Sequence, residues 1–355
     1  MPYSKRSRVP FKQVVTDLLD KNKPFSPTHL HRFSDIDPAD LASLRIAWPQ
    51  VDLERRVSLM EDLEDLADSD TLVSFDDLAR FALEDSDPRV RAVAIRLLWE
   101  SDDSKLIPIF IKMMKSDPDE MVRAGAAGGL GMFVYLGELE EINSDQLERV
   151  ENSLLAVYHG NDKPIVRRRA LEALGYSGRE EVSELIRTAF KSSDKDWQAS
   201  ALFAMGRSAD ESWSEYVLSR LNDPELEVRL EAVRAAGELE LTEARLPLIE
   251  MVTDSEDLDV DLRAAAVWAL SQIGGEGVRS ALEKLSESIE DDDEAFFVDE
   301  ALDNLDFKEG AGGFGLIGLT PKIDEEHTHI IDLSQKDELE EEGDEDEDLL
   351  YGSKN

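Results

Sequence analysis

Apolar residues recur with a helical period in segments that follow one another along most of the chain. In one segment, an acidic turn at Asp223-Pro224 leads into residues 226–237, whose apolar side chains fall on one side of a helix. Another helical apolar stretch precedes each such segment, for example Ile107 to Met114. Two helices per repeat of this length are typical of an α-solenoid. The pattern therefore predicts an all-α fold, a right-handed solenoid of stacked helix pairs.

The repeats align on one position, which we call the anchor. Its residues are Arg91, Arg123, Arg167, Gln198, Arg229 and Arg263, with steps from 31 residues (167 to 198) to 44 residues (123 to 167). Alanine stands three residues after each anchor, where a small side chain lets neighbouring helices approach closely. The residues four and seven positions after the anchor are apolar and are expected to face the core.

Two further features suggest where the repeated helices end. Glycine follows at the same place in four repeats, and these glycines are expected to be left-handed helix C-caps: Gly131, Gly175, Gly206 and Gly237. The 44-residue step contains an insertion at residues 133–145, which we expect to form a longer loop between repeats.

The chain divides into three parts by composition. Residues 1–71 are predicted to form a basic arm (Lys5, Arg6, Arg8) and a helical cap that covers the first repeat. Residues 72–309 form the solenoid, and residues 292–305 are expected to be a degraded last helix pair. Residues 310–355 are predicted to be a flexible glycine-rich linker and a disordered acidic tail, with 14 Asp and Glu against 3 Lys after residue 320.

The repeated residues resemble a known family. The pattern Asp-Pro-x-x-x-Val-Arg-x-x-Ala, followed a few residues later by Leu-Gly or an equivalent pair, is similar to the HEAT repeat over residues 72–305. The variant is the short one of phycobilisome-lyase-like proteins, and the whole chain resembles uncharacterised bacterial HEAT-repeat proteins with an acidic tail. The resemblance implies a solenoid, and most HEAT-repeat arrays are adaptors.

Charge and cysteine content narrow the possible functions. With 80 Asp and Glu against 39 Lys and Arg, the net charge is −41, which disfavours binding to nucleic acid and favours a basic protein or a metal cation as a charged partner. The chain has no cysteine, so disulfides, thiolate metal sites and a cysteine nucleophile are excluded. No apolar run approaches a membrane span, and the N-terminus lacks the apolar core of a secretory signal. The cytoplasm is the expected compartment.

The anchor arginines and the histidine pairs could each form a binding site, but each also has a simpler structural interpretation. The anchor arginines could form an anion-binding row, but their regular spacing and the acidic turns before them favour ion pairs that hold the repeats together. The histidine pairs His29/His31 and His327/His329 do not provide three or four convergent ligands, so no metal site and no cofactor is predicted.

Helix positions that packing does not require are the candidate binding residues. If the second helix of each pair lines the concave side, the residues two and five positions after the anchor face a groove. The predicted partner-binding residues are Arg169, Glu172, Phe203, Arg234 and Trp268. The alternative is that Phe203 and Trp268 are partly buried under neighbouring helices.

These observations predict a non-enzymatic protein–protein interaction scaffold that binds through its concave face. The alternative is a bilin lyase-like or chaperone-lyase activity on a tetrapyrrole-carrying protein, which the repeat type alone suggests. The acidic tail could keep the chain soluble, bind ions or a basic partner, or fold back onto the basic arm. No catalytic residues are predicted.

Overall fold

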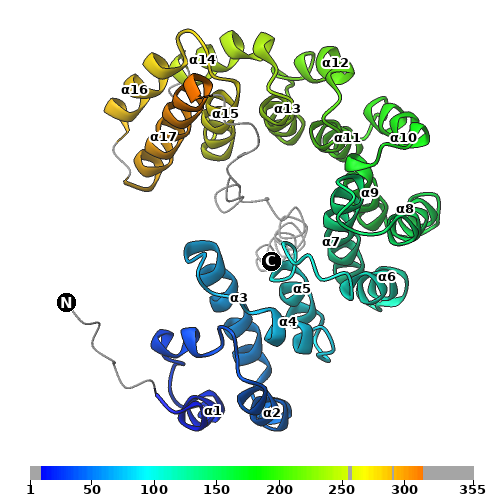
Figure 1. Ribbon diagram of the computed structural model, residues 1–355, viewed down its shortest axis with the longest axis vertical. Helices are drawn as coiled ribbons and strands as arrows, with labels where there is room; N and C mark the ends of the chain where they lie inside the picture. The colour runs from blue at the N-terminus through cyan, green and yellow to red at the C-terminus, as the bar shows by residue number, and fades with distance from the viewer. Residues whose placement is uncertain (1–8, 255–257, 290–291, 315–355) are drawn as a thin grey trace, which may run out of the picture. The chain divides into compact units, whose positions relative to one another are not determined.

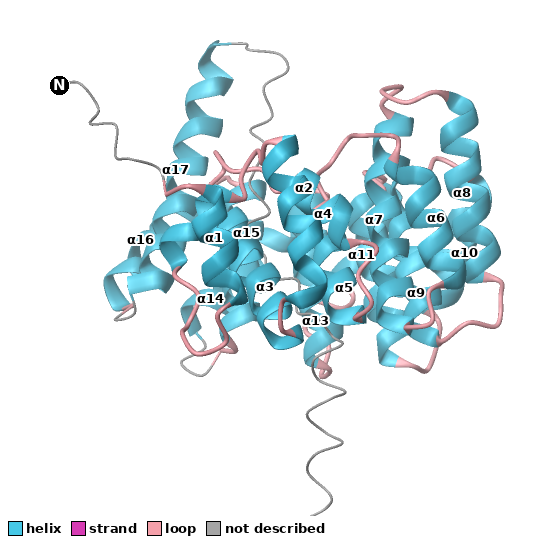
Figure 2. Cartoon of the chain, turned by 90° about the horizontal axis from the view of Figure 1, so that it is seen from below, coloured by secondary structure: helices cyan, strands magenta, loops and turns pink. Residues whose placement is uncertain are grey.

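The computed structural model describes residues 9–254, 258–289 and 292–314, and every statement below concerns these residues. They all belong to one compact unit, Met1–Ile317. Figure 2 shows only helices and connecting loops in the described part of the chain. The all-α solenoid predicted from the sequence is confirmed.

The N-terminal segment contains three α-helices and two short 3-10 helices. They are α1 (Phe11–Leu19), η1 (Pro27–Arg32), α2 (Pro38–Ala47), η2 (Trp48–Gln50) and α3 (Leu53–Ser69). From α4 onward the helices alternate between two layers, and in Figure 1 the second helix of each pair lies on the inner side.

The outer helices are α4 (Asp76–Ala82), α6 (Leu106–Ser116), α8 (Ser144–Tyr158), α10 (Glu180–Phe190), α12 (Ser214–Leu218), α14 (Arg245–Asp254) and α16 (Val278–Ser288). The inner helices are α5 (Pro88–Arg96), α7 (Glu120–Glu138), α9 (Pro164–Ala173), α11 (Lys195–Arg207), α13 (Leu226–Glu238), α15 (Val260–Ile273) and α17 (Asp292–Phe314). Short 3-10 turns join some of them: η3 (Leu174–Tyr176), η4 (Glu211–Trp213) and η5 (Thr242–Ala244).

Aspartate caps start several of the inner helices. The side chains of Asp87, Asp119, Asp194 and Asp259 each accept a hydrogen bond from a backbone N–H of the following first turn, at 2.8 to 3.1 Å. A carboxylate there satisfies donors that have no partner within the helix and interacts favourably with the helix dipole. The acidic turns seen in the sequence therefore fix where these helices begin.

The apolar rows predicted from the repeat form a continuous core. All six alanines three residues after the anchors are fully buried: Ala94, Ala126, Ala170, Ala201, Ala232 and Ala266. The next apolar positions, such as Leu171 and Leu202, are equally buried. Because neither layer buries its apolar side alone, stacking of successive pairs stabilises the array.

The four glycines that recur at the same position of their repeats do not have the C-cap role that we expected. Gly131, Gly206 and Gly237 lie inside helices and Gly175 lies in η3, and none of them has a positive φ. A Cβ at Gly175 would stand 2.9 Å from the Cα of Ala204 in the next inner helix. The C-cap prediction was wrong, because these glycines face the next repeat and allow adjacent backbones to approach closely.

The insertion at residues 133–145 is mostly helical rather than a loop. It lengthens α7 to 19 residues, and Phe133, Val134 and Leu136 of this extension are buried. Asn143 then starts α8 with a capping box to Gln146. The apolar side chains made the helix continue because they could be buried between α6 and α8.

At both ends the structure departs from the expected boundaries. Helix α3 stacks on α5 as the later inner helices stack on each other, so the pairing extends into residues 1–71. Residues 292–305 form part of the single helix α17, not a helix pair, and α17 continues through the glycine-rich residues 310–313. The arm at residues 1–8 and the acidic tail from residue 315 lie outside the described residues.

Candidate functional site

The anchor arginines connect successive repeats. The guanidinium of Arg91 donates to both carboxylate oxygens of Asp117 (2.9 and 2.6 Å) and to the carbonyl of Asp85 (2.9 Å). Arg123 repeats both contacts one pair later, with the carboxylate of Asp162 (2.8 and 2.7 Å) and the carbonyl of Asp117 (2.8 Å). The hydrogen bonds from Arg123 are the main reason why the pKa of Asp162 lies below its usual value.

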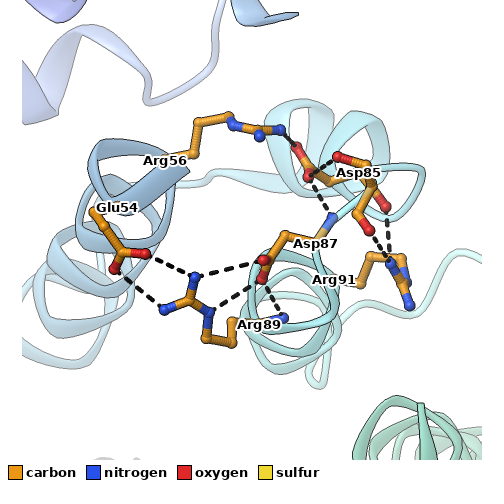
Figure 3. Close-up of polar contacts among 7 residues, drawn as sticks. Glu54, Arg56, Asp85, Asp87, Arg89 and Arg91 are labelled. Carbon is orange, nitrogen blue, oxygen red and sulfur yellow. Dashed lines mark hydrogen bonds and ion pairs between the residues drawn. The ribbon is translucent and has the colours of Figure 1, made fainter. Parts of the chain in front are cut away.

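The same contact occurs before the first repeat that the sequence revealed. Arg56 of α3 pairs with Asp85 at 2.5 Å, and Asp85 also accepts a hydrogen bond from the Trp48 indole (2.6 Å). Figure 3 shows Arg56, Asp85 and Arg91 in this chain of contacts, beside the more exposed Arg89 and its partners Glu54 and Asp87. Arg56 is thus an additional anchor, which the sequence analysis missed because Arg55 rather than an apolar residue precedes it and Leu59 rather than alanine stands three residues later.

The row of anchor arginines is interrupted by Gln198, and the contacts between repeats change there. Gln198 keeps the hydrogen bond to a carbonyl of its own turn, that of Ser192 (2.6 Å). Arg167, the anchor of the preceding repeat, donates to the carbonyl of Tyr158, and its guanidinium lies over the ring of Trp197. Arg91, Arg123 and Arg263 contact carboxylates and carbonyls of their own or the following repeat. The structural interpretation of the anchors is confirmed.

Three of the five predicted binding residues belong to one polar network on the inner helices. Arg169 pairs with Glu172 within α9 (2.7 Å), and Glu172 accepts a hydrogen bond from Ser200 of α11 (2.6 Å). Arg234 makes the corresponding pair with Glu231 within α13 (2.9 Å). Glu172 and Ser200 are buried, and the others are half-buried. The network crosses three successive inner helices.

The pKa values of the two carboxylates in this network are shifted in opposite directions. Burial opposes ionisation of Glu172, but the charge of Arg169, the Ser200 hydroxyl and Arg168 outweigh it and hold the pKa of Glu172 below its usual value. Burial and the negative charge of Glu172 raise the pKa of Glu231, although Arg234 partly offsets them. Oxygen Oε2 of Glu231 is buried without a hydrogen-bond partner.

The predicted Phe203 belongs to an aromatic cluster that the sequence analysis missed. The guanidinium of Arg207 lies over the ring of Phe203 (4.2 Å to the centroid) and over that of Tyr176 (4.9 Å). Tyr176 in turn contacts Tyr135 of α7, with ring centroids 5.1 Å apart, and Tyr135 is 42% exposed. The signal was present, because Tyr176 and Arg207 both stand nine residues after an anchor position.

The predicted Trp268 contributes to packing. Atom Cζ3 of its ring lies 2.5 Å from where a Cβ at Gly237 would stand, so the ring covers this glycine of α13. Trp268 is half-buried, as the alternative interpretation expected. It lies on α15, whereas the polar network lies on α9, α11 and α13.

Helix α7 presents glycine at two positions that packing does not explain. Gly125 and Gly128 stand two and five residues after the anchor, in the same rows as Arg169 and Glu172 of α9. A Cβ at Gly128 would meet only Trp99, at 3.7 Å, and a Cβ at Gly125 would meet only Ile95, also at 3.7 Å. These are ordinary contact distances, so alanine would fit at both positions.

Comparisons with known proteins identify the type of repeat in this chain. The HEAT-repeat family model matches residues 75–148 and 214–306. This chain contains HEAT repeats. No curated protein sequence matches it significantly.

Several solved structures resemble the HEAT-repeat chain at low sequence identity. A chain of the CpcE–CpcF complex of phycocyanin lyase from a Nostoc species is 18% identical, with 86% of this chain and 98% of that chain covered and a TM-score of 0.49. Human deoxyhypusine hydroxylase is 18% identical (74% and 95% covered, TM-score 0.32). An importin beta is 14% identical (83% and 46% covered, TM-score 0.39).

A metal site or a membrane-spanning helix would be a further functional feature of the described residues. His29 lies 3.1 Å from the carboxylate of Asp17, and among residues 9–254, 258–289 and 292–314 no three His, Asp or Glu side chains are arranged to hold a metal ion. Within the same residues, no helix combines the length and apolarity needed to cross a membrane.

Proposed function

We propose that this HEAT-repeat chain is a non-enzymatic scaffold that binds a partner protein on the inner face of α7, α9 and α11. We call this region the inner site and define it by Gly125, Gly128, Tyr135, Arg169, Tyr176, Phe203 and Arg207. A cytoplasmic location is part of the proposal, because a cysteine-free chain suits a reducing compartment.

The observation that carries the proposal is the glycine pair of α7. Glycine inside a helix costs roughly 0.5–1 kcal/mol relative to alanine, and alanine would fit at Gly125 and Gly128 without a close contact. The fold therefore gains nothing from these glycines in the free chain. What they provide is a stretch of helix without side chains, on which the backbone or a large side chain of a partner can lie closely.

The side chains beside this bare stretch suit a protein partner. Tyr135, Tyr176, Phe203 and Arg207 are stacked on one another and remain partly exposed. Tyrosine and arginine are the residues that most often dominate the binding energy of protein interfaces. Because stacking already restricts these side chains, binding would cost little additional conformational entropy.

The experiment fills the bare stretch. Gly128→Leu adds a side chain to the inner site, and Ala156→Leu adds the same group to the exposed side of the outer helix α8. Both tagged variants and wild type are used to capture proteins from native lysate, after circular dichroism has shown equal helicity. We expect Gly128→Leu to lose the partner and Ala156→Leu to keep it. Equal recovery by all three would refute the inner site.

A second pair of variants tests the aromatic cluster. Phe203→Ala with Arg207→Ala removes the stacked groups, and the expected result is at least a tenfold loss of affinity for the captured partner, about 1.4 kcal/mol or more. A coloured, bilin-bound preparation with no stoichiometric protein partner would instead favour the lyase alternative.

A further inference from the structure

Ser192 lies in the turn before α11, at a position where three other turns have aspartate. Those residues, each six positions before its anchor, are Asp85, Asp117 and Asp223. Each aspartate side chain accepts a hydrogen bond from the backbone N–H two residues further on, at 2.8 to 3.0 Å, and Oγ of Ser192 accepts the same bond from Asp194 (3.1 Å). The carbonyl of Ser192 accepts a hydrogen bond from Gln198, as the aspartate carbonyls do from their anchors. The turn before α11 therefore has the geometry of the others but lacks the carboxylate.

The missing carboxylate leaves the preceding anchor, Arg167, without an ion pair among the described residues. Where an arginine anchor precedes such an aspartate, the two form a pair, as Arg56 does with Asp85 (2.5 Å, Figure 3). Arg167 instead donates a hydrogen bond to the carbonyl of Tyr158 (2.8 Å), and its guanidinium lies over the rings of Tyr158 and Trp197, 5.9 and 5.5 Å from their centroids. Because Trp197 belongs to α11, this cation already lies beside the first turn of that helix.

A negative charge at residue 192 has a counterpart elsewhere in the fold. Asp85 stands two residues before Asp87, the cap of α5, as residue 192 stands two residues before Asp194, the cap of α11. Two acids at this spacing repel each other, and Arg56 compensates the charge of Asp85. Arg167 can compensate a charge at residue 192 in the same way, because its guanidinium is held beside α11 and its side chain is only half-buried.

We propose that Ser192 is a phosphorylation site and that its phosphate pairs with Arg167, which joins α9 to α11. A phosphate carries a charge of about −1.5 to −2 at neutral pH and three acceptor oxygens, and arginine binds it through two parallel hydrogen bonds. Ser192 itself is half-buried, but Lys191 and residues 193–195 around it are exposed, so the turn is accessible to a kinase. The proposal does not depend on the inner site, because it concerns the turn that precedes α11.

The modification requires a nucleoside triphosphate as phosphoryl donor and a protein kinase as catalyst. The bond between the γ-phosphorus and the oxygen that bridges it to the β-phosphorus breaks, and a bond forms between this phosphorus and Oγ of Ser192. The hydroxyl proton is released, and the nucleoside diphosphate leaves. The product has the negative charge that the other turns carry permanently, so the contact between these two repeats becomes one that the cell can switch.

The first experiment tests the charge by substitution in the full chain. Ser192→Asp introduces the residue of the other turns, and we expect it to raise the equilibrium constant for folding about three- to fivefold, measured by urea denaturation. Ser193→Asp is the matched control: it places the same charge one residue further on, at an exposed position, and is expected to change the constant less than about twofold. Arg167→Gln copies the side chain at Gln198, and in its presence Ser192→Asp should give no gain.

The second experiment uses the full chain with phosphoserine incorporated at residue 192. Its equilibrium constant for folding is expected to exceed that of the unmodified chain about tenfold, because hydrogen bonds between charged groups are stronger than neutral ones. Phosphorus NMR follows the ionisation of the phosphate. Pairing with Arg167 favours the dianion, so the second pKa of the phosphate should lie below its value in the Arg167→Gln variant. A phosphate that stays in solvent has the same pKa in both chains, and this result would overturn the ion pair.

The third experiment detects the modification itself. The chain is isolated from its native cells in the presence of phosphatase inhibitors, and mass spectrometry of its peptides is expected to find phosphate on Ser192. In Ser192→Ala produced in the same cells, the signal from this turn should disappear. Absence of phosphate from Ser192, or phosphate on Ser193 alone, would overturn the modification. Equal stabilisation by Ser192→Asp in the presence and in the absence of Arg167 would overturn the pairing.

Discussion

Arginine–carboxylate pairs occupy two regions of the inner layer of helices, and they differ in what they connect. At the turn edge, Arg91 and Arg123 pair with Asp117 and Asp162, which lie 26 and 39 residues further along the chain. On the inner face, Arg169 and Arg234 pair with Glu172 and Glu231, only three residues away on the same helix. The first set joins one repeat to the next.

The difference separates the contribution to stability from the surface available for binding. A pair between repeats must be broken when the stack opens, so its residues are fixed by the fold. A pair within one helix does not itself join two repeats, although Glu172 also accepts a hydrogen bond from Ser200 of the next inner helix. Residues of the inner face can therefore be selected for binding a partner, because most of them are not needed to join the repeats.

The largest effect is expected at the turn edge. Arg91→Ala removes the cationic partner of Asp117, whose side chain is only 8% exposed, and leaves that buried carboxylate with no paired arginine. We expect a loss of about 3–5 kcal/mol in the free energy of unfolding, measured by urea denaturation followed by circular dichroism. The control is Arg89→Ala: its side chain is 49% exposed, and the expected loss is below about 1 kcal/mol. Equal losses would show that the ion pairs of the anchor arginines do not hold the repeats together.

Glycine-to-alanine substitutions are expected to change stability in opposite directions at closely packed and at open positions. Gly237→Ala would place a Cβ 2.8 Å from the Cα of Ala269 and force α13 and α15 apart, at a cost of about 1–3 kcal/mol. Gly128→Ala meets nothing closer than 3.7 Å and is expected to stabilise the free chain by roughly 0.5–1 kcal/mol. Thermal unfolding of both variants tests the two signs. Destabilisation by Gly128→Ala would mean that the fold does require this glycine.

The buried carboxylates of the inner face are expected to respond oppositely to neutralisation. Glu172→Gln removes a charge that its surroundings favour and should cost about 1.5 kcal/mol at pH 7. Glu231→Gln removes a charge that they disfavour, so stability at pH 7 should stay equal or rise. Urea unfolding midpoints at pH 7 provide the measurement.

The pH dependence provides the control for this pair. Because the folded pKa of Glu231 is raised, the folded wild type binds a proton more tightly than the unfolded chain. Wild type should therefore gain stability relative to Glu231→Gln as the pH falls from 7 towards the unfolded pKa of about 4.5. The contribution of Glu172 is present above that value and lost below it, because its folded pKa is lowered. A difference between wild type and Glu231→Gln that does not change with pH would contradict the assignment.

The smallest effect is expected beyond the helical array. Removing residues 315–355, which follow the end of α17 at Phe314, is expected to change the unfolding free energy by less than about 0.5 kcal/mol. Differential scanning calorimetry of the full and shortened chains measures the effect. A large drop in the melting temperature would show that the tail packs on the helices.

Much of the fold could be predicted because its signals are local. Aspartate caps, helical apolar periods and alanine rows lie within one or two turns of the residues that they organise, and Ala170 and Leu171 are buried as the repeat required. The insertion after Gly131 was misassigned as a loop, because only burial between α6 and α8 makes that stretch helical.

The candidate site was predicted less well. Arg169, Glu172 and Arg234 do belong to one network, but Trp268 covers Gly237 on a neighbouring helix, and the stacking of Tyr135, Tyr176 and Arg207 was missed. Their contacts cross helices whose relative rotation the spacing of residues does not specify. The predicted groove residues remain a hypothesis that the inner-site variants test.

By itself the sequence determined the all-α class, the paired helices, the starts of most inner helices and the structural role of the anchor arginines. Only the tertiary structure decided which glycines allow close packing, which leave a bare surface, and which carboxylate is held charged. The physical reason is that periodicity fixes the direction in which a side chain leaves its own helix. The burial, the partner and the field that it meets there depend on neighbouring helices that are brought beside it only when the chain folds.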